Sequence, residues 1–239
     1  MKKILMVVTS FEKYPQTARA CGLWLGEAVH FVSRLEAARH AVDIVSPRGG
    51  YTPIDPLSLT LADELDWEWY QNKRFMNRLG ATLPPTAVNP QDYAAIYYAG
   101  GHGAVWDFPD NTALQDLGRT IYQQGGVVSA VCHGIAGLLN IRLDNGSLLV
   151  EGKQISCFSN TEERLSGLAG QLPFLPESEV VKRGAHYHKA PEPWDPFALS
   201  TSVSSAVRIR RPPSGWPNYC WRHCAHMTGR DCAASAVPA

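Results

Sequence analysis

Short, nearly continuous apolar runs alternate along the chain with segments whose apolar residues recur at helical spacing. The first run, residues 2–10 ("KKILMVVTS"), is typical of a strand buried on both faces of a parallel sheet. Residues 22–41 follow with a helical pattern, and residues 42–47 return to a strand pattern. Residues 92–133 continue as strand, helix and strand. Strands that alternate with helices predict an α/β fold with a doubly wound parallel sheet.

One domain with an insertion, residues 1–199, accounts for most of the chain. The segment over about residues 50–91 is too long for an ordinary connection, and it has proline-rich ends and an aromatic, helix-compatible centre. We expect a small helical flap near the sheet edge. The aromatic residues expected to form the core of this flap, with a binding surface as the alternative, are Trp67, Trp69, Tyr70 and Phe75. Residues 148–168 then predict a turn, a strand and a helix that begins at Asn160.

Residues 200–239 form an atypical tail without strand or helix periodicity, rich in Arg, Pro, Trp, Cys and His. One hypothesis is a zinc site, although the spacing matches no standard pattern. Its candidate ligands are Cys220, His223, Cys224, His226 and Cys232. A better-fitting hypothesis is the loss of one nucleotide near codon 199, because a shifted frame can encode the start of a regular strand and a helix. The DNA sequence of the gene would test it.

Length and charge restrict the class of protein. The 239 residues are 45% hydrophobic, enough for one large α/β domain. Residues 1–199 hold 17 Lys and Arg against 21 Asp and Glu, so nucleic acid is not an expected partner. No apolar run reaches the roughly 18 residues that cross a membrane, and no signal peptide is evident. We therefore expect a cytoplasmic protein without a membrane partner, with free thiols at Cys21, Cys132 and Cys157.

Residues 127–139 place one cysteine at a sharp corner of the expected fold. Cys132 separates a β-branched apolar run from a run of small residues, and His133 follows it directly. A strand-to-helix turn with small neighbours lifts its central side chain above the strand ends, where ligands bind. The helix N-terminus and the imidazole both favour the thiolate, so a thiol pKa of about 8.5 falls to roughly 3.5–7.5 in such settings. This pattern indicates a nucleophile, with a small core residue as the alternative.

Glycines end the preceding strand, in residues 99–111 ("AGGHGAVWDFPDN"). The backbone N–H groups of Gly100 and Gly101 could approach a substrate closely and form an oxyanion hole with the amide of His133, beside His102. The spacing of a phosphate loop or of a dinucleotide-binding loop is not met. A tight turn without a binding role is the alternative.

Six motifs follow one another along the chain: "GLWLGEAVHF", "SPRGG…PIDPLS", "AGGHGAVWDFPDN", "VCHGIAGLLN", "EGKQISCFSNTEE" and "GAHYHKAPEPW". Together they resemble the ThiJ/PfpI superfamily, specifically its stress-chaperone and glyoxalase III branch, over nearly all of residues 3–198. The resemblance implies a flavodoxin-like fold of the class I glutamine amidotransferase type, with a nucleophile elbow and a small helical insertion. In that superfamily, a cysteine on the elbow, the next histidine and a later acid form a catalytic triad. These roles would belong to Cys132, His133 and Glu163, with Glu162 as the nearby alternative.

The resemblance also implies a second acid beside the thiol, and the matching residue is Glu27. The superfamily often has a glutamate just before it, where this chain has Gly26. Glu27 follows an apolar run over residues 23–25, so we expect burial, whereas a solvated carboxylate on an amphipathic helix is the alternative. Burial and a neighbouring thiolate would both raise the pKa of Glu27 and suit it to proton transfer.

The implied activity is conversion of methylglyoxal or glyoxal into a 2-hydroxy acid without metal, glutathione or another cofactor. The implied partners are a small reactive aldehyde, unfolded or glycated proteins, and a second copy in a homodimer. His186 and His188 make a weak metal site, because no thiolate or acid pair is near them in sequence. Two other functions stay open, because one fold serves many chemistries: a holdase chaperone with a redox-sensing cysteine, and a cysteine amidase or peptidase.

Overall fold

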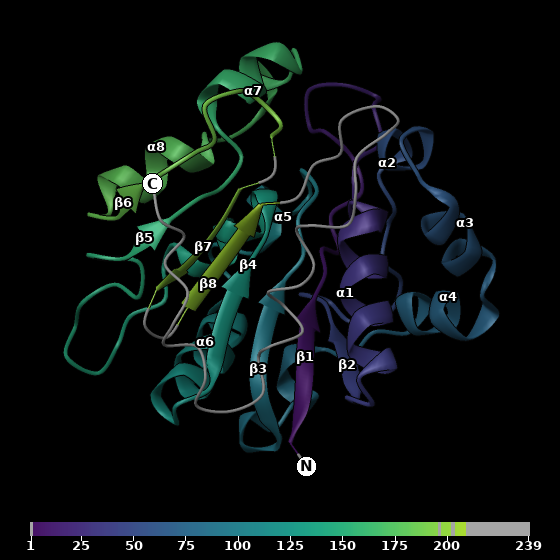
Figure 1. The fold of residues 1–239 in the computed structure, drawn as a ribbon, viewed down its shortest axis with the longest axis horizontal. Coiled ribbons are helices and arrows are strands. Elements are labelled where there is room, and N and C mark those ends of the chain that lie inside the picture. Colours follow the sequence, from purple (N-terminus) through teal and green to yellow (C-terminus); the bar gives the residue numbers. More distant parts are fainter. Residues whose placement is uncertain (1, 196, 202–203, 209–239) are drawn as a thin grey trace.

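A central sheet organises this computed structural model, which describes residues 2–195, 197–201 and 204–208 (Figure 1). In spatial order its strands are β2 (Val42–Val45), β1 (Lys3–Val7), β3 (Tyr93–Tyr98), β4 (Val127–Ala130), β8 (Ser204–Arg208) and β7 (Phe197–Thr201). Neighbouring strands from β2 to β8 are parallel, and β7 pairs antiparallel with β8 at the edge. The prediction of a doubly wound parallel sheet is confirmed.

Helices cover both faces of this sheet (Figure 1). They are α1 (Leu25–Ala37), α2 (Pro56–Thr60), α3 (Glu64–Gln71), α4 (Lys73–Gly80), α5 (Ala104–Asp107), α6 (Thr112–Gln123), α7 (Asn160–Leu165) and α8 (Pro176–Lys182). Short 3₁₀ helices are η1 (Pro85–Ala87), η2 (Pro90–Asp92), η3 (Cys132–Leu138) and η4 (Ala169–Gln171). None of the helices among the described residues has both the length and the apolar character needed to cross a bilayer.

The first strand explains why its sequence is apolar throughout. Successive side chains on a strand point to opposite faces, so Leu5 and Val7 share one core with residues of α6, including Leu114. Ile4 and Met6 point the other way and share a second core with residues of α1. Both faces of β1 are therefore buried, as its continuous apolar run predicts.

The expected insertion is helical and packs against α1 through α2 and α3. It contains a break at Asn72, which ends α3 and whose side chain accepts a hydrogen bond from the Phe75 amide at the start of α4. Phe75 is buried in the core that includes α1, and Trp69 packs against that core. Trp67 and Tyr70, however, are 41% and 36% exposed. The prediction that these two rings belong to the flap core is wrong, because they lie on the outer side of a short helix.

The last two described strands extend the sheet beyond residue 199. Strand β7 crosses the boundary that the sequence suggests, and β8 pairs in register with β4 through Ser204, Ser205 and Ala206. Backbone groups make this pairing, and the periodicity of side chains gives little sign of it. The tail ligands proposed for zinc, and most of the segment to which the frameshift hypothesis applies, lie outside the described residues.

A second, two-stranded sheet pairs β5 (Gln154–Ile155) with β6 (His186–Tyr187) in parallel. The side chain of His188, just after β6, contacts the Gln154 side chain. Among the described residues, His186 and His188 belong to no group of three potential metal ligands. The helix expected from Asn160 is present as α7, and Ser159 caps it.

Candidate active site

Cys132 lies at the turn between β4 and η3, where the sequence places the nucleophile. Its φ is +54°, a left-handed conformation that is strained for a residue with a side chain. The turn packs tightly against the end of β3, since a Cβ added at Gly134 would lie 2.1 Å from the Tyr98 carbonyl oxygen. The small residues around the cysteine therefore permit the corner. A 3₁₀ helix follows where a helix is expected, and Cys132 is 7% exposed.

A line of contacts runs from the thiol to a buried carboxylate. The Cys132 Sγ lies 3.1 Å from Nδ1 of His133, and Nε2 of the same ring contacts Oε1 of Glu163. All three side chains are buried. A thiol, an imidazole and a carboxylate in this order can transfer the thiol proton to the imidazole, with the carboxylate holding the ring and stabilising the resulting cation.

The two adjacent glutamates of α7 have different surroundings. Glu162 accepts hydrogen bonds from the Ser159 amide at 2.8 Å and the Ser159 hydroxyl at 2.6 Å, in a capping box at the start of α7. It also accepts a hydrogen bond from the Trp194 amide at 2.5 Å. Glu163 contacts His133 instead. Glu163 is thus the carboxylate that contacts the His133 ring. Glu162 instead accepts hydrogen bonds from Ser159 and Trp194 and so holds the backbone at the start of α7.

His102 contacts the same carboxylate, a role that its sequence motif does not indicate. Its Nε2 lies 3.4 Å from Oε2 of Glu163, and its ring centroid lies 4.2 Å from that of His133. Burial raises the pKa of Glu163, but the neighbouring His133 and the hydrogen bonds from both imidazoles outweigh burial and lower it to about 2. Burial, followed by repulsion from the protonated form of His133, lowers the pKa of His102. His102 is therefore neutral at physiological pH and helps to hold Glu163 ionised.

Glu27 approaches the thiol from α1, and its expected burial is confirmed at 2% exposure. Its Oε2 accepts a hydrogen bond of 2.6 Å from the Gly100 amide. A Cβ added at Gly100 would lie 2.7 Å from that oxygen and 2.9 Å from Cβ of Cys132. Gly100 is thus the point where the second acid and the nucleophile come together, because any larger residue would collide with both.

These contacts change the roles expected for the glycine loop. The Gly100 amide donates a hydrogen bond to Glu27, so in this structure it orients the acid. Gly101 has φ +100°, and a Cβ there would lie 2.1 Å from the Gly22 carbonyl oxygen, which explains the need for glycine. Oxyanion or substrate binding by Gly100, Gly101 and His102, together with the His133 amide, stays a prediction.

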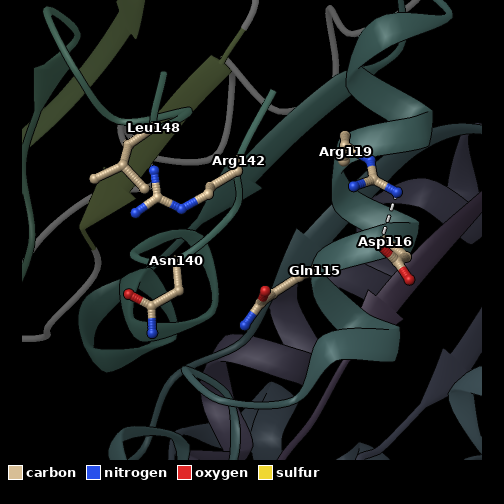
Figure 2. Close-up of a pocket in the computed structure, with 6 residues that line it drawn as sticks. All are labelled: Gln115, Asp116, Arg119, Asn140, Arg142 and Leu148. Atoms are coloured by element: carbon tan, nitrogen blue, oxygen red, sulfur yellow. Dashed lines mark ion pairs between the residues drawn. The ribbon is translucent and has the colours of Figure 1, made fainter. Parts of the chain in front are cut away.

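A polar surface pocket of about 360 Å³ lies elsewhere, between α6 and the segment after η3 (Figure 2). It is lined by Gln115, Asp116, Arg119, Asn140, Arg142 and Leu148. Arg119 is paired there with Asp116 at 2.8 Å. None of the side chains predicted for the site lines this pocket, so it does not represent the expected catalytic centre.

Comparison with known proteins identifies the family of this chain. The sequence profile described as the DJ-1/PfpI family matches residues 24–187, which include Glu27, the elbow and Glu163. The chain belongs to the DJ-1/PfpI family. It is 32% identical to "Glutathione-independent glyoxalase HSP31" of Saccharomyces cerevisiae over 83% of this chain and 88% of that protein. It is 29% identical to "Glyoxalase 3" of Candida albicans over 84% of this chain and 89% of that protein.

Comparison with solved structures agrees on the fold. The structure of the Rapid Encystment Protein 24 kDa of Francisella tularensis superposes with a TM-score of 0.83 at 36% identity, over 87% of this chain and 92% of that one. The crystal structure of glyoxalase III from Candida albicans superposes with a TM-score of 0.79 at 28% identity, over 87% of this chain and 91% of that one. The recognised fold and family are therefore confirmed.

Among the described residues of this DJ-1/PfpI chain, two groups of three side chains bring potential metal donors within 4.8 Å of one another. The first comprises His102, His133 and Glu163, whose donor atoms already contact one another beside the thiol. A metal there would replace the contacts that orient the triad. The second group, His30, Asp63 and Asp66, lies on α1 and at the start of α3 and shares no residue with the first.

Proposed function

We propose that the protein is a glutathione-independent glyoxalase of the glyoxalase III type, which converts methylglyoxal or glyoxal and water into a 2-hydroxy acid without a cofactor. The observation that carries this proposal is the meeting of two groups at Gly100. The Cys132 thiol supplies a nucleophile, and the Glu27 carboxylate supplies a base next to it. Relatives named as glutathione-independent glyoxalases support the same substrate class.

The first step is addition of the thiol to the aldehyde. Cys132 gives its proton to His133, which lies 3.1 Å from the sulfur, and the sulfur forms a bond to the aldehyde carbon. The proton then passes to the former carbonyl oxygen, so the product is a neutral hemithioacetal. Glu163 stabilises the transient imidazolium, because its low pKa keeps it ionised throughout.

The second step is an isomerisation, and it requires a base beside the sulfur. Glu27 removes the proton from the carbon that bears sulfur and returns it to the adjacent carbon through an enediol, while the hydroxyl proton moves between the two oxygens. The hemithioacetal thereby becomes a thioester of the 2-hydroxy acid, with no change in composition. The Gly100 amide holds Oε2 of Glu27, which fixes the carboxylate for this transfer.

The third step is hydrolysis. Water adds to the thioester carbon, the carbon–sulfur bond breaks, and the 2-hydroxy acid leaves as the thiol is restored. His133 takes a proton from the water and returns one to the departing sulfur. The reaction uses one water and needs no redox partner. A thiol that must stay reduced suits the cytoplasm, which we propose as the location.

The test is lactate formation from methylglyoxal by the purified chain, without glutathione or added metal. Cys132→Ser and Glu27→Gln are compared with Cys21→Ser, a second buried thiol, and Glu68→Gln, an exposed carboxylate. We expect lactate from the wild type and both controls, and a loss of roughly 10²–10⁴-fold in the two site variants. A folded wild type that makes no lactate, or a Glu27→Gln variant with full activity, contradicts the proposal.

A holdase chaperone is a second candidate, because the insertion exposes large apolar side chains. They are Tyr51, Leu61, Trp67 and Tyr70. Exposed apolar groups of this kind can bind unfolded or glycated proteins. Suppression of client aggregation that is retained in Cys132→Ala and lost when Trp67 and Tyr70 are replaced by serine would favour it. Release of ammonia from amides would instead favour the amidase alternative. The homodimer stays a prediction of the family resemblance.

A further inference from the structure

The second group of potential metal ligands lies where the insertion packs against α1. His30 belongs to the second turn of α1, Asp63 caps the N-terminus of α3, and Asp66 lies in its first turn. One donor atom from each side chain lies within 4.8 Å of the others. The cluster shares no residue with the Cys132 site, and the proposed reaction does not use it.

The capping box of α3 fixes one oxygen of each carboxylate. Oδ1 of Asp63 accepts a hydrogen bond of 2.7 Å from the Asp66 amide, and Oδ2 of Asp66 accepts one of 3.1 Å from the Asp63 amide. The other oxygen of each carboxylate faces the imidazole of His30. Oδ2 of Asp63 lies 3.1 Å and Oδ1 of Asp66 lies 3.3 Å from Nε2 of His30.

Asp66 provides an independent sign of a ligand. The residue is 5% exposed, and within the described part of the chain no donor forms a hydrogen bond to its buried Oδ1. The Nε2 of His30 carries at most one hydrogen, and Asp63 lies nearer to it than Asp66. A buried carboxylate oxygen that shares one imidazole nitrogen with a nearer carboxylate, and accepts no hydrogen bond from the described residues, is poorly satisfied, whereas a cation at this place would satisfy it.

We propose that His30, Asp63 and Asp66 bind a divalent first-row transition ion of the Zn²⁺ class. Metal bonds of about 2.0–2.1 Å in a tetrahedron place neighbouring donors roughly 3.3–3.4 Å apart. The two nitrogen–oxygen separations of 3.1 and 3.3 Å fit this spacing. Two carboxylates neutralise the ion, and the His30 side chain is 19% exposed, so an ion can enter and water can complete the coordination.

Binding would connect the insertion to the helix that carries Glu27. His30 lies one turn after Glu27 on α1, and the two aspartates hold the start of α3. Nε2 must present its lone pair to the ion, so its proton is released to solvent or moves to Nδ1. The ion would be structural in this position, because none of its ligands belongs to the triad or takes part in the proposed reaction.

The experiment measures zinc per chain by elemental analysis after loading the full chain with Zn²⁺ and removing the excess by dialysis. His30→Gln and Asp66→Asn are compared with the wild type and with His40→Gln, which removes a histidine just after α1. Asparagine at 66 keeps an acceptor for the capping box. We expect both site variants to retain one ion fewer than the wild type and His40→Gln, and to lose the increase in Tm that zinc gives.

Thermal melts in EDTA establish that each variant folds, and Asp63→Asn replaces any variant that does not. Co²⁺ spectra distinguish this site from cysteine-containing ones, because thiolate ligands give charge-transfer bands that nitrogen and oxygen ligands lack. Equal zinc contents in all folded proteins would overturn the assignment. The assignment would also be overturned if a variant retained one ion fewer but the Co²⁺ site that it lost showed thiolate bands in the wild type. Neither result depends on glyoxalase activity, so this site and the proposed function are tested separately.

Discussion

Replacing Glu163 by glutamine tests the electrostatic centre of the site. The side chain keeps its size, but the negative charge that faces His133 and His102 is removed. The imidazole of His133 then loses the group that orients it and stabilises its charged form. We expect the rate of lactate formation to fall by roughly 10²–10⁴-fold. We also expect a loss of folding stability with a particular dependence on pH.

The magnitude follows from the pKa of Glu163. A carboxyl whose pKa falls from 4.5 in the unfolded chain to about 2 in the folded one contributes about 3 kcal/mol to stability at neutral pH. The unfolded state binds the proton first as the pH falls, so the contribution is complete above the unfolded pKa and decreases below it. At about pH 3 less than half of it remains, and it disappears below the folded pKa.

Urea unfolding of the wild type and Glu163→Gln, from neutral pH down to about pH 3, measures this difference. The free energies of unfolding should differ by about 3 kcal/mol at neutral pH and converge in acid. Glu68→Gln, which removes an exposed carboxylate from α3, should differ little from the wild type at any pH. A difference that is absent at neutral pH, or that stays constant into acid, would refute the argument that an ionised Glu163 stabilises the fold.

Two further substitutions test the packing around the site and in the insertion. Gly100→Ala should lower kcat by roughly 10²-fold and stability by about 1–3 kcal/mol, because the new Cβ displaces Glu27. Gly170→Ala, where a Cβ meets nothing within 4 Å, should change neither the lactate assay nor the melting curve, and equal behaviour of the two variants would contradict the crowding argument. Phe75→Ala should cost about 3–5 kcal/mol in chemical denaturation, and Trp67→Ala about 1 kcal/mol or less. Equal losses in the free energy of unfolding for the two variants would mean that Trp67 is part of the core.

Much of the fold follows from local patterns. The apolar run of β1 and the helical spacing of α1 predict the first βαβ unit, since both faces of the strand are buried. The break at Asn72 was missed, although asparagine is a good helix cap, because the apolar pattern continues across it. Strand β8 was missed for a different reason. Its pairing with β4 joins segments far apart in sequence, and side-chain periodicity does not report such backbone pairing.

The candidate site is less visible in the sequence than the fold. Cys132 and His133 are adjacent and stand at a recognisable turn, so the pair can be predicted. The choice between Glu162 and Glu163 needed the structure, yet Ser159 followed three residues later by Glu162 is the pattern of a capping box and could have decided it. No local signal brings His102 to Glu163, because 61 residues separate them.

The two buried acids of the site have different hydrogen-bond donors, and this difference fits the roles proposed for them. Glu163 faces two imidazoles, and its low pKa means that it does not exchange protons during the reaction at neutral pH. Glu27 accepts a hydrogen bond from the neutral amide of Gly100 beside the thiol. A carboxylate that a neutral donor positions next to the reacting carbon can gain and lose a proton within one turnover. In the reaction proposed above, the fixed charge would therefore belong to the triad and the mobile proton to Glu27.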